Sequence, residues 1–412
     1  MFLLTPKSAN DPPLAKRVQK TATAFVLDMG PTGLGIARAL GREGIPVVGM
    51  DNDSYATGLK SRYCKPVVTF DPSKEPKEAL KILLNEGKKL PQAGILYPAS
   101  DAFVLLVSRF RKELSEYFRL ALPSEEIIEA TINKRKLYEL AERVGIPHPE
   151  TQYPDSMQDV EAIKDQFEYP VFIKPHYSHI WSQKYKNKGF KVTNSEELVE
   201  KFRAIFEAKL DAMVQSIVIG PASNLFQVHA YFSEKHEPLV TYVARKLRQY
   251  PNEFGVGTYR ETIHNEELLH LGIKLLREIR YRGPGYVEFK KDERDGQYKM
   301  IELNTRYGTG VILLACAGVN IPLVQYMDLT GEPPLKPIDY KDGVKSLDAT
   351  IDVFAFCELN RKGELPLLTW LKSILNVDCH AHFAWDDMRP FLIEYVVDCF
   401  RFFRKMRHKT NW

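Results

Sequence analysis

The stretch from Gly285 to Arg306 constrains this chain most strongly, because it joins a turn signal to two alternating segments. Apolar and polar residues alternate on both sides of Asp295-Gly296. The polar positions are Tyr286, Glu288 and Lys290 before the turn, and Glu302, Asn304 and Arg306 after it. Period-2 alternation around a glycine turn predicts a β-hairpin with one apolar and one polar face.

The length of the turn decides whether the two glutamates share a face. A two-residue loop would pair Glu288 with Leu303 and separate the glutamates. A three-residue loop with Gly296 in the left-handed conformation pairs Glu288 with Glu302, on the face that carries Asn304. Facing carboxylates repel, but their oxygens can hold a hard cation such as Mg²⁺, which takes its other ligands from phosphate and water. The alternative is a solvated face with scattered charge.

Length and composition bound the remaining possibilities. A chain of 412 residues predicts two or three domains, and 44% hydrophobic with 27% charged residues is typical of a soluble globular protein. The net charge of +4 gives no reason to expect nucleic acid as a partner. Five scattered cysteines fit a reducing compartment, so we expect a cytoplasmic protein. No signal peptide is expected in the first twenty residues, and no stretch is long and uncharged enough to cross a bilayer.

The N-terminal part predicts a βαβ unit. A short apolar strand, 24–28, is followed by the glycine turn 29–35, a helix over 36–42 and a second strand over 47–50. One alternative is dinucleotide binding, with Asp51 or Asp53 on a ribose. The glycines at 30, 33 and 35 do not follow the G-x-G-x-x-G pattern, however, so a tight turn in a Rossmann-like domain is the simpler interpretation. A further strand, 93–97, leads to Ser100 and Asp101 at the carboxyl edge, where such sheets bind ligands.

Two lysines lie where a bound anion would explain them. Lys134 lies in the first turn of a predicted helix that Asn133 can cap, and a cation there is disfavoured unless it shares a phosphate. The alternative is a solvent-facing lysine. Lys174 lies on the apolar strand 169–175 and needs an anionic partner or loses its proton.

The middle of the chain predicts a small α+β lid and further strands. Residues 176–189, which include Ser178 and His179, are expected to form a mobile loop, and Ser195 is expected to cap the next helix. Strands follow at 213–220, 226–232 and 238–247. In the last of these, Lys246 and Arg248 are expected to share a face, with an anion between them or, alternatively, solvent around them. Gly308-Thr-Gly310 then precedes a helix.

Residues 335–412 carry no motif that we can interpret. Residues 391–409 predict a helix with a dense apolar run and a basic end. Packing on the protein is the simpler interpretation, and peripheral docking on an anionic membrane is the alternative. The tract 379–382, Cys-His-Ala-His, lacks a second cluster and is expected to be ordinary packing rather than a metal site.

Taken in order, these segments resemble the ATP-grasp superfamily, in particular the branch of carboxylate–amine ligases that includes D-aspartate ligase. The resemblance covers roughly residues 22–335 and rests on order and spacing more than on any single motif. The motifs are the Rossmann-like start, Asn133-Lys134 before Gly145-Ile146-Pro147, residues 171–175, Gln215 to Gly220, Arg245 to Pro251, Val287 to Phe289, and Glu302 to Arg306.

The resemblance implies an α/β fold of ATP-grasp architecture. Its parts would be an N-terminal tail (1–21), a Rossmann-like pre-ATP-grasp domain (22–122), an ATP-grasp domain (123–335) with a lid at about 147–222 and a central antiparallel sheet, and a C-terminal helical extension (336–412). It further implies a ligase that activates a carboxylate as an acyl phosphate with ATP and Mg²⁺ or Mn²⁺, couples it to an amine, and releases ADP and phosphate. A homodimer through the N-terminal domain is also implied. An NAD-dependent dehydrogenase and a non-catalytic ATP-binding scaffold remain as alternatives.

The resemblance also assigns roles to individual residues. Lys134 and Lys174 would hold nucleotide phosphates, and Gln215 with the backbone of Ser216, Ile217 and Val218 would meet the adenine. Glu288, Glu302 and Asn304 would bind the metal. Arg306, Lys246 and Arg248 would act on the transferring phosphate. The substrate-binding loops would include Gly33, Ser100, Asp101, Ser178, His179 and Gly308.

The sequence departs from the family pattern at three places. The lid loop is not rich in glycine, so its phosphate contacts need another explanation. Thr305 stands where proline is frequent, with little expected effect. Gln215 stands where many relatives have glutamate, which changes what the nucleobase or ribose meets.

Overall fold

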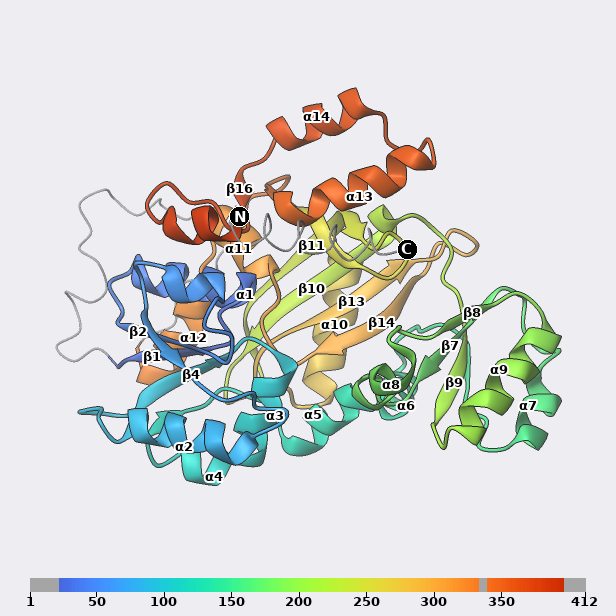
Figure 1. Cartoon of the computed structure of the whole chain (residues 1–412), viewed down its shortest axis with the longest axis horizontal. Coiled ribbons are helices and arrows are strands. Elements are labelled where there is room, and N and C mark those ends of the chain that lie inside the picture. The colour runs from blue at the N-terminus through green and yellow to red at the C-terminus, as the bar shows by residue number, and fades with distance from the viewer. Residues whose placement is uncertain (1–21, 333–338, 396–412) are drawn as a thin grey trace, which may run out of the picture.

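The computed structural model describes residues 22–332 and 339–395, and the strands of these residues form three sheets (Figure 1). The first sheet lies at the N-terminal end of the chain, the second is small and lies at the opposite side, and the third runs between them (Figure 1).

The first sheet is parallel, and its strand order is β3-β2-β1-β4-β5. Its central strand β1 is fully buried, as expected for a strand covered on both faces. Proline at the start of α1 favours the helix there, because its missing N–H would be unpaired anyway. The predicted βαβ unit is therefore confirmed. The bounds are β1 Ala24–Leu27, α1 Pro31–Gly41, β2 Val47–Asp51, η2 Thr57–Lys60, β3 Lys65–Val68, α2 Pro76–Gly87, β4 Gly94–Pro98, α3 Asp101–Arg109, α4 Arg111–Leu114 and β5 Phe118–Arg119.

Two capped helices connect this sheet to the rest of the chain. Ser124 caps α5 (Glu125–Ile132), and Asn133 caps α6 (Lys134–Val144) by accepting from two backbone N–H groups. Gly145 ends α6 with a φ of 69°, a left-handed conformation that glycine adopts without strain. The predicted cap at Asn133 and the predicted end at Gly145 are both confirmed.

The small sheet is antiparallel, in the order β6-β9-β7-β8. The segment predicted as a mobile loop contains helix α8 instead, because Trp181 is fully buried and packs on Tyr185 and Phe190. Asn194, not Ser195, caps the next helix. The bounds are β6 Thr151–Gln152, α7 Met157–Ile163, β7 Val171–Pro175, α8 Ser178–Tyr185, β8 Phe190–Val192, α9 Ser195–Glu207 and β9 Ala212–Ser216.

The third sheet is the largest, with the order β14-β13-β10-β11-β12-β15-β16. Helix α10 covers one of its faces, where alternate residues of β10 such as Val228 pack against Leu268 and Leu275. The bounds are η3 Ala222–Asn224, β10 Leu225–Phe232, β11 Pro238–Tyr250, β12 Val256–Ile263, α10 Glu266–Glu278, β13 Gly283–Lys291, β14 Tyr298–Asn304, α11 Gly310–Cys316, α12 Ile321–Thr330, β15 Lys345–Leu347, α13 Ala349–Arg361, α14 Leu367–Leu375 and β16 Cys379–His380.

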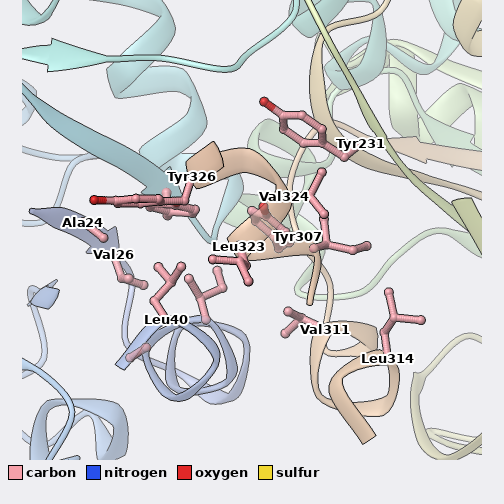
Figure 2. Close-up of a cluster of buried hydrophobic side chains, with 14 of the residues drawn as sticks. Ala24, Val26, Leu40, Tyr231, Tyr307, Val311, Leu314, Leu323, Val324 and Tyr326 are labelled. Atoms are coloured by element: carbon pink, nitrogen blue, oxygen red, sulfur yellow. The ribbon is translucent and has the colours of Figure 1, made fainter. Parts of the chain in front are cut away.

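A continuous core joins the opposite face of this sheet to the first sheet. Figure 2 shows part of it: Val26 and Leu40 of the N-terminal unit lie near Leu323 of α12. Two buried hydroxyls also cross the junction, since Tyr97 donates to the carbonyl of Pro322 and Tyr326 to that of Ala22. The N-terminal sheet is thereby fixed against the large sheet.

The C-terminal segment is not only helical. Strand β15 pairs with β12 and β16 pairs with β15, so the large sheet continues past residue 335, where the sequence suggested an end. The predicted domain limits stay predictions. The helix predicted at 391–409 lies largely outside the described residues. No single described helix is long and apolar enough to cross a membrane, although α11 and α12, which meet at 92°, pass that test as a pair.

Candidate functional site

The hairpin of β13 and β14 brings two carboxylates face to face. Glu288 lies opposite Glu302, and Tyr286 lies opposite Asn304, so the predicted pairing is confirmed. The turn itself is longer than expected, because Asp292 pairs with Gln297 and leaves four residues between them. A β-bulge in β14 after Glu288 restores the predicted register. Gly296 has the expected left-handed φ, 73°.

A lysine from a distant element contacts each carboxylate. Lys134 Nζ lies 2.8 Å from Glu302 Oε1, and Lys246 Nζ lies 2.8 Å from Glu288 Oε2. Gln227 also donates to Glu288 Oε2, at 2.9 Å. Lys134 is 8% exposed, so it is not the solvent-facing lysine of the alternative interpretation. Because all these contacts use one oxygen of each glutamate, the second oxygen of each remains for another ligand.

One more lysine, Lys174, acts on these carboxylates. Burial opposes the ionised form of Glu302, but Lys134 and Lys174 together outweigh it, and its pKa is held well below the usual range. The Glu302 side chain is 40% exposed, so solvent screens part of this attraction. The pKa of Lys174 is lowered by burial, which Glu302 and Glu288 partly offset. Lys174 also lies 3.3 Å from the hydroxyl of Tyr138.

Lys188 reaches the same place from the lid. Burial of its ammonium group lowers its pKa, while Glu302 and Glu288 raise it and Lys246 and Lys134 lower it further. The side chain as a whole is exposed, and Nζ donates to the carbonyl of Phe254 in the loop between β11 and β12. The lid therefore contributes a positive charge close to the two carboxylates.

Arg306 connects the hairpin to the first sheet. Its guanidinium pairs with Asp101, with Nε 2.6 Å from Oδ1, and also lies 3.5 Å from the Tyr286 hydroxyl. Burial lowers the pKa of Arg306, but Tyr286 and Asp101 outweigh burial and raise it. The structure thus brings the predicted residues Arg306 and Asp101 together, at the carboxyl end of β4. Ser100 stands beside them as the residue before α3.

The prediction that Lys246 and Arg248 share a face is wrong. Lys246 lies opposite Arg260 on β12, but Arg248 lies opposite Tyr259, because a β-bulge in β11 inserts one extra residue between them. Since successive residues of β12 point to opposite faces, the bulge turns Arg248 away from the carboxylates. Its guanidinium pairs instead with Asp352 of α13 and is buried there. Arg248 is therefore placed to hold the C-terminal helices on the sheet.

The segment predicted to meet the adenine lies on the lid side of the carboxylates. Gln215 is buried, donates to Thr151 and accepts from Tyr138, whose pKa burial raises to about 12. The Ser216 N–H donates to Glu150, and the Ile217 carbonyl accepts from Arg294, so these two backbone groups already have partners. Val218 is buried.

The dinucleotide alternative offered two acids, Asp51 and Asp53. Asp53 is exposed and accepts from the N–H of Tyr55. The Asp51 carboxylate accepts from the backbone N–H groups of Met29 and Asp53, so it is occupied within the turn. Asp28 accepts from the N–H of Gly30 at the start of α1, where its charge would repel a pyrophosphate. Gly33 packs against the carbonyl of Asp28 and is not part of the cluster around the carboxylates.

The remaining predicted loop residues differ in outcome. Gly308 joins the cluster, because a Cβ there would lie 2.9 Å from the Tyr286 ring. Ser178 and His179 begin α8, but their side chains lie outside the described part of the chain. Lys188, Gln227, Arg260 and Tyr138 were not predicted. Lys188 lies in the segment 176–189 that was predicted as a loop, whereas nothing in the spacing of Gln227 or Arg260 distinguished them from ordinary strand residues.

The donor set fits a magnesium ion better than a softer metal. Two carboxylates and the amide of Asn304 are hard oxygen ligands on adjacent strands, and few protein ligands are what Mg²⁺ requires when phosphate and water complete its shell. Among the described residues, no group of three histidine, cysteine, aspartate or glutamate side chains is arranged to hold a metal ion. The Cys-His-Ala-His tract at 379–382 accordingly provides no such group.

A separate cavity of about 410 Å³ lies away from this cluster. Arg111, Arg119 and Arg282 line it together with Glu234 and Asp328. None of the residues that contact Glu288 or Glu302 lines it. The chemistry of the carboxylate cluster is therefore independent of this cavity.

The arrangement as a whole concentrates charge of both signs on one face of one sheet. Four lysines and two carboxylates lie together, with an arginine–aspartate pair beside them. Such a site can bind a polyphosphate together with a divalent cation and can stabilise negative charge that develops on a transferring phosphoryl group.

Sequence comparisons point in the same direction. A family model for the ATP-binding domain of the carbamoyl-phosphate synthase L chain matches residues 261–326. The D-aspartate ligase of Enterococcus faecium is 30% identical over 237 residues, which are 55% of this chain and 56% of that relative. The chain thus matches little more than half the length of this relative.

Solved structures share the fold at lower identity. The N5-carboxyaminoimidazole synthetase of Staphylococcus aureus has a TM-score of 0.64 at 14% identity, over 84% of this chain and 86% of its own. The biotin carboxylase of Campylobacter jejuni has 0.63 at 16%, over 79% and 74%. The L-amino acid ligase of Bacillus licheniformis has 0.57 at 16%, over 77% and 76%.

Proposed function

We propose, from the premise that this chain belongs to the ATP-grasp superfamily, that it is an ATP-dependent carboxylate–amine ligase. It activates a carboxylate as an acyl phosphate, couples it to an amine, and releases ADP and phosphate. One observation carries the proposal above the others: Glu288 and Glu302 face each other, and each is contacted by a lysine from another element.

Different side chains of the site bind the phosphates, the adenine and the metal ion of ATP. Lys134 and Lys174 bind phosphate oxygens, and Lys134 exchanges its present partner Glu302 for phosphate when the nucleotide enters. Gln215 and the segment 216–218 line the adenine end. A Mg²⁺ or Mn²⁺ ion held by Glu288, Glu302 and Asn304 would neutralise phosphate charge and orient the γ-phosphoryl group.

The reaction needs no side-chain nucleophile. A carboxylate oxygen of the acid attacks the γ-phosphorus of ATP, the bond to the bridging oxygen breaks, and ADP leaves. The amine nitrogen then attacks the acyl carbon, phosphate leaves with the former carboxylate oxygen, and the nitrogen loses a proton. Lys246 and Arg306 offset the charge that builds up on the phosphoryl oxygens, so catalysis is mostly positioning and electrostatics.

The lid has contacts suited to closing over this site. Phe172 of β7 packs on Phe254 with ring centroids 4.6 Å apart, Lys188 donates to the Phe254 carbonyl, and Lys191 lies 3.5 Å from Glu253. Closure through these contacts would exclude water from the acyl phosphate, which would otherwise hydrolyse.

Amino acids are the substrates to test first. The relatives named D-aspartate ligase and L-amino acid ligase suggest a free amino acid as one partner in the amide bond. The cations of the site suit an acidic substrate as well as phosphate. We further propose a cytoplasmic protein and a homodimer, which light scattering would test. Membrane contact through the C-terminal residues stays a prediction from the sequence.

The experiment is a screen of acid–amine pairs for ADP release that depends on both. The ligase predicts ADP, phosphate and an amide in equal amounts for at least one pair. A scaffold predicts nucleotide binding with no turnover on any pair. The dehydrogenase predicts thermal stabilisation by NAD and none by ATP with Mg²⁺.

A further inference from the structure

Three arginines line the cavity of about 410 Å³ that lies away from the carboxylate cluster. Arg111 begins α4, Arg119 ends β5, and Arg282 directly precedes β13. The end of α12 contributes Asp328 to the same cavity, and the turn between β10 and β11 contributes Glu234. The cavity therefore lies where the first sheet meets the large sheet, and the proposed ligase function does not use it.

Backbone carbonyl groups orient two of the three guanidinium groups. Arg111 donates through both of its Nη atoms, to the carbonyls of Leu122 and Pro123. Arg119 Nη1 donates to the carbonyl of Leu329 at 2.6 Å. A carbonyl carries no full charge, so these contacts fix the two arginines without neutralising them. Since a guanidinium has five N–H groups, each of these arginines keeps donors for a further acceptor.

A glycine brings the third arginine to the same place. Gly283 follows Arg282 and has a φ of 87°, which favours glycine. A Cβ at this position would lie 2.2 Å from the carbonyl oxygen of Ala121. Glycine therefore lets the start of β13 pack closely on the chain two residues after Arg119. This contact places Arg282 beside the segment that carries Arg119.

The two carboxylates of the cavity offset only part of the positive charge. Glu234 lies 3.5 Å from Arg282 Nη1, but its side chain is 80% exposed, so solvent screens the pair. Asp328 accepts from the hydroxyl of Tyr231. Arg282 Nε is buried without a hydrogen-bond partner in the described chain. Burial lowers the pKa of Arg111, and the charge of Arg282 lowers it further, so the two guanidinium groups repel each other.

An anion in the cavity would offset this repulsion, and the number of arginines favours phosphate. A carboxylate has one charge and two oxygens, which match the fork of a single arginine. A phosphate group carries a charge of about −1.5 to −2 near pH 7 and at least three acceptor oxygens. It can accept from several guanidinium groups at once, including the unpaired Nε of Arg282.

The cavity is separate from the site of phosphoryl transfer. Glu288 lies five residues after Gly283 on β13, and a strand rises about 3.3 Å per residue, so their Cα atoms are about 17 Å apart. None of the residues that line the cavity contacts Glu288 or Glu302. A phosphate bound between the arginines is therefore not the group that is transferred.

We propose that Arg111, Arg119 and Arg282 form a second anion site, which binds the phosphate group of a small molecule. The bound phosphate connects the first sheet to the start of β13 and so stabilises the junction between the two sheets. Its source is either free inorganic phosphate or a phosphate ester, and both present the same oxygens to the arginines. The site does not depend on the ligase function.

The first test titrates three probes into the full-length protein and measures binding by calorimetry. Inorganic phosphate and glycerol 3-phosphate represent the two sources, and malonate represents a carboxylate ligand. Potassium chloride at equal ionic strength controls for screening. At least one phosphate probe should bind at one site per chain, and malonate should bind more weakly. Binding of both phosphate probes supports free phosphate as a ligand, and binding of glycerol 3-phosphate alone supports an ester.

The second test compares Arg282→Gln with the matched control Arg277→Gln. Arg277 forms an exposed pair with Glu237 and does not line the cavity. Because each substitution removes only a screened ion pair, the two free variants should melt at the same temperature. Arg282→Gln should weaken the bound phosphate probe about tenfold or more, since it loses charged hydrogen bonds, whereas Arg277→Gln should not.

The variant Lys134→Met distinguishes the cavity from the nucleotide site. Phosphate held by the arginines should bind to this variant as it does to the wild type. Four outcomes overturn the proposal: neither phosphate probe binds to the wild type, Arg282→Gln binds phosphate as tightly as Arg277→Gln, Lys134→Met loses as much phosphate affinity as Arg282→Gln, or malonate binds as tightly as phosphate. Failure of the ligase function looks different, because the probes then bind and depend on Arg282 although no acid–amine pair releases ADP.

Discussion

Glu302 lies directly opposite Glu288 because a bulge in β14 compensates for a four-residue turn. Without the bulge, Glu288 would face Ile301 and the two carboxylates would point to opposite faces of the sheet. Lys134 and Lys246 then reach them from a helix and from a strand two positions away in the sheet. The two lysines thus offset the repulsion between the carboxylates. When a nucleotide binds, its phosphates can replace the carboxylates as partners of these lysines.

Removing one carboxylate should abolish turnover without unfolding the protein. Glu302→Gln keeps the shape of the side chain but loses the charge that binds the metal, so we expect kcat for ADP release to fall at least 100-fold. The matched control is Glu278→Gln on the exposed side of α10, which should retain full activity. Activity of Glu302→Gln within threefold of the control would show that the metal assignment is wrong.

Lys134 and Lys136 form a second matched pair, two residues apart on α6. Lys134 is buried against Glu302, whereas Lys136 forms an exposed pair with Glu129. Lys134→Met should weaken ATP binding about tenfold to a hundredfold, because charged hydrogen bonds contribute about 1.5–3 kcal/mol. Lys136→Met should leave it unchanged. Titration calorimetry with ATP and Mg²⁺ measures the affinity of both variants. Equal ATP affinities of Lys134→Met and Lys136→Met would show that Lys134 does not bind the nucleotide.

Arg248 and Lys246 should separate stability from catalysis. Arg248→Met leaves the buried Asp352 carboxylate with the neutral donors Thr258 and Trp370 but no counter-ion, which costs about 3–5 kcal/mol in unfolding free energy. Its effect on the KM for ATP should be small. Lys246→Met should lower kcat with a smaller loss of stability. Urea denaturation and steady-state kinetics on both variants check this. A large fall in kcat with little loss of stability for Arg248→Met would show that Arg248 acts on the transferring phosphate after all.

His229 should make the protein sensitive to acid. Its pKa is lowered to about 3 by burial and by Arg260, against about 6.5 in an unfolded chain. Between these values the unfolded state binds more protons, so the stabilising contribution of neutral His229 is complete above pH 6.5 and is lost as the pH falls, by up to about 1.4 kcal/mol per pH unit.

The variant His229→Gln isolates this effect. It cannot take up the proton, so the stability difference between wild type and variant should shrink steadily from pH 7 to pH 5. Denaturation at four pH values measures it. A constant difference would mean that the imidazole titrates normally in the folded protein.

The sequence predicted those parts of the site that local patterning determines. Alternation around Gly296 predicted the hairpin, although the register that makes the carboxylates face each other comes from a bulge that the sequence did not indicate. Helix-start chemistry was enough for the cap at Asn133 and for the place of Lys134, because both depend on neighbours in the chain. Trp181 shows the limit, since a helix formed where polar composition suggested a loop, and it formed because an aromatic core of the lid covers that tryptophan.

Long-range relationships could not be predicted. The bulge that turns Arg248 away from Lys246 depends on pairing with β12, and the partner of Arg248 lies on α13, more than 100 residues later. Strands β15 and β16 were missed because each is short and gains its stability from the edge of a sheet formed earlier in the chain.

The central claim, activation of a carboxylate by phosphoryl transfer, is tested most directly with an acid substrate that carries ¹⁸O in both carboxylate oxygens. After coupling in unlabelled water, phosphorus NMR of the released phosphate should show one ¹⁸O atom per phosphate, since the acyl phosphate passes that oxygen on. Phosphate that carries no label, with amide formed at the same rate, would contradict the account.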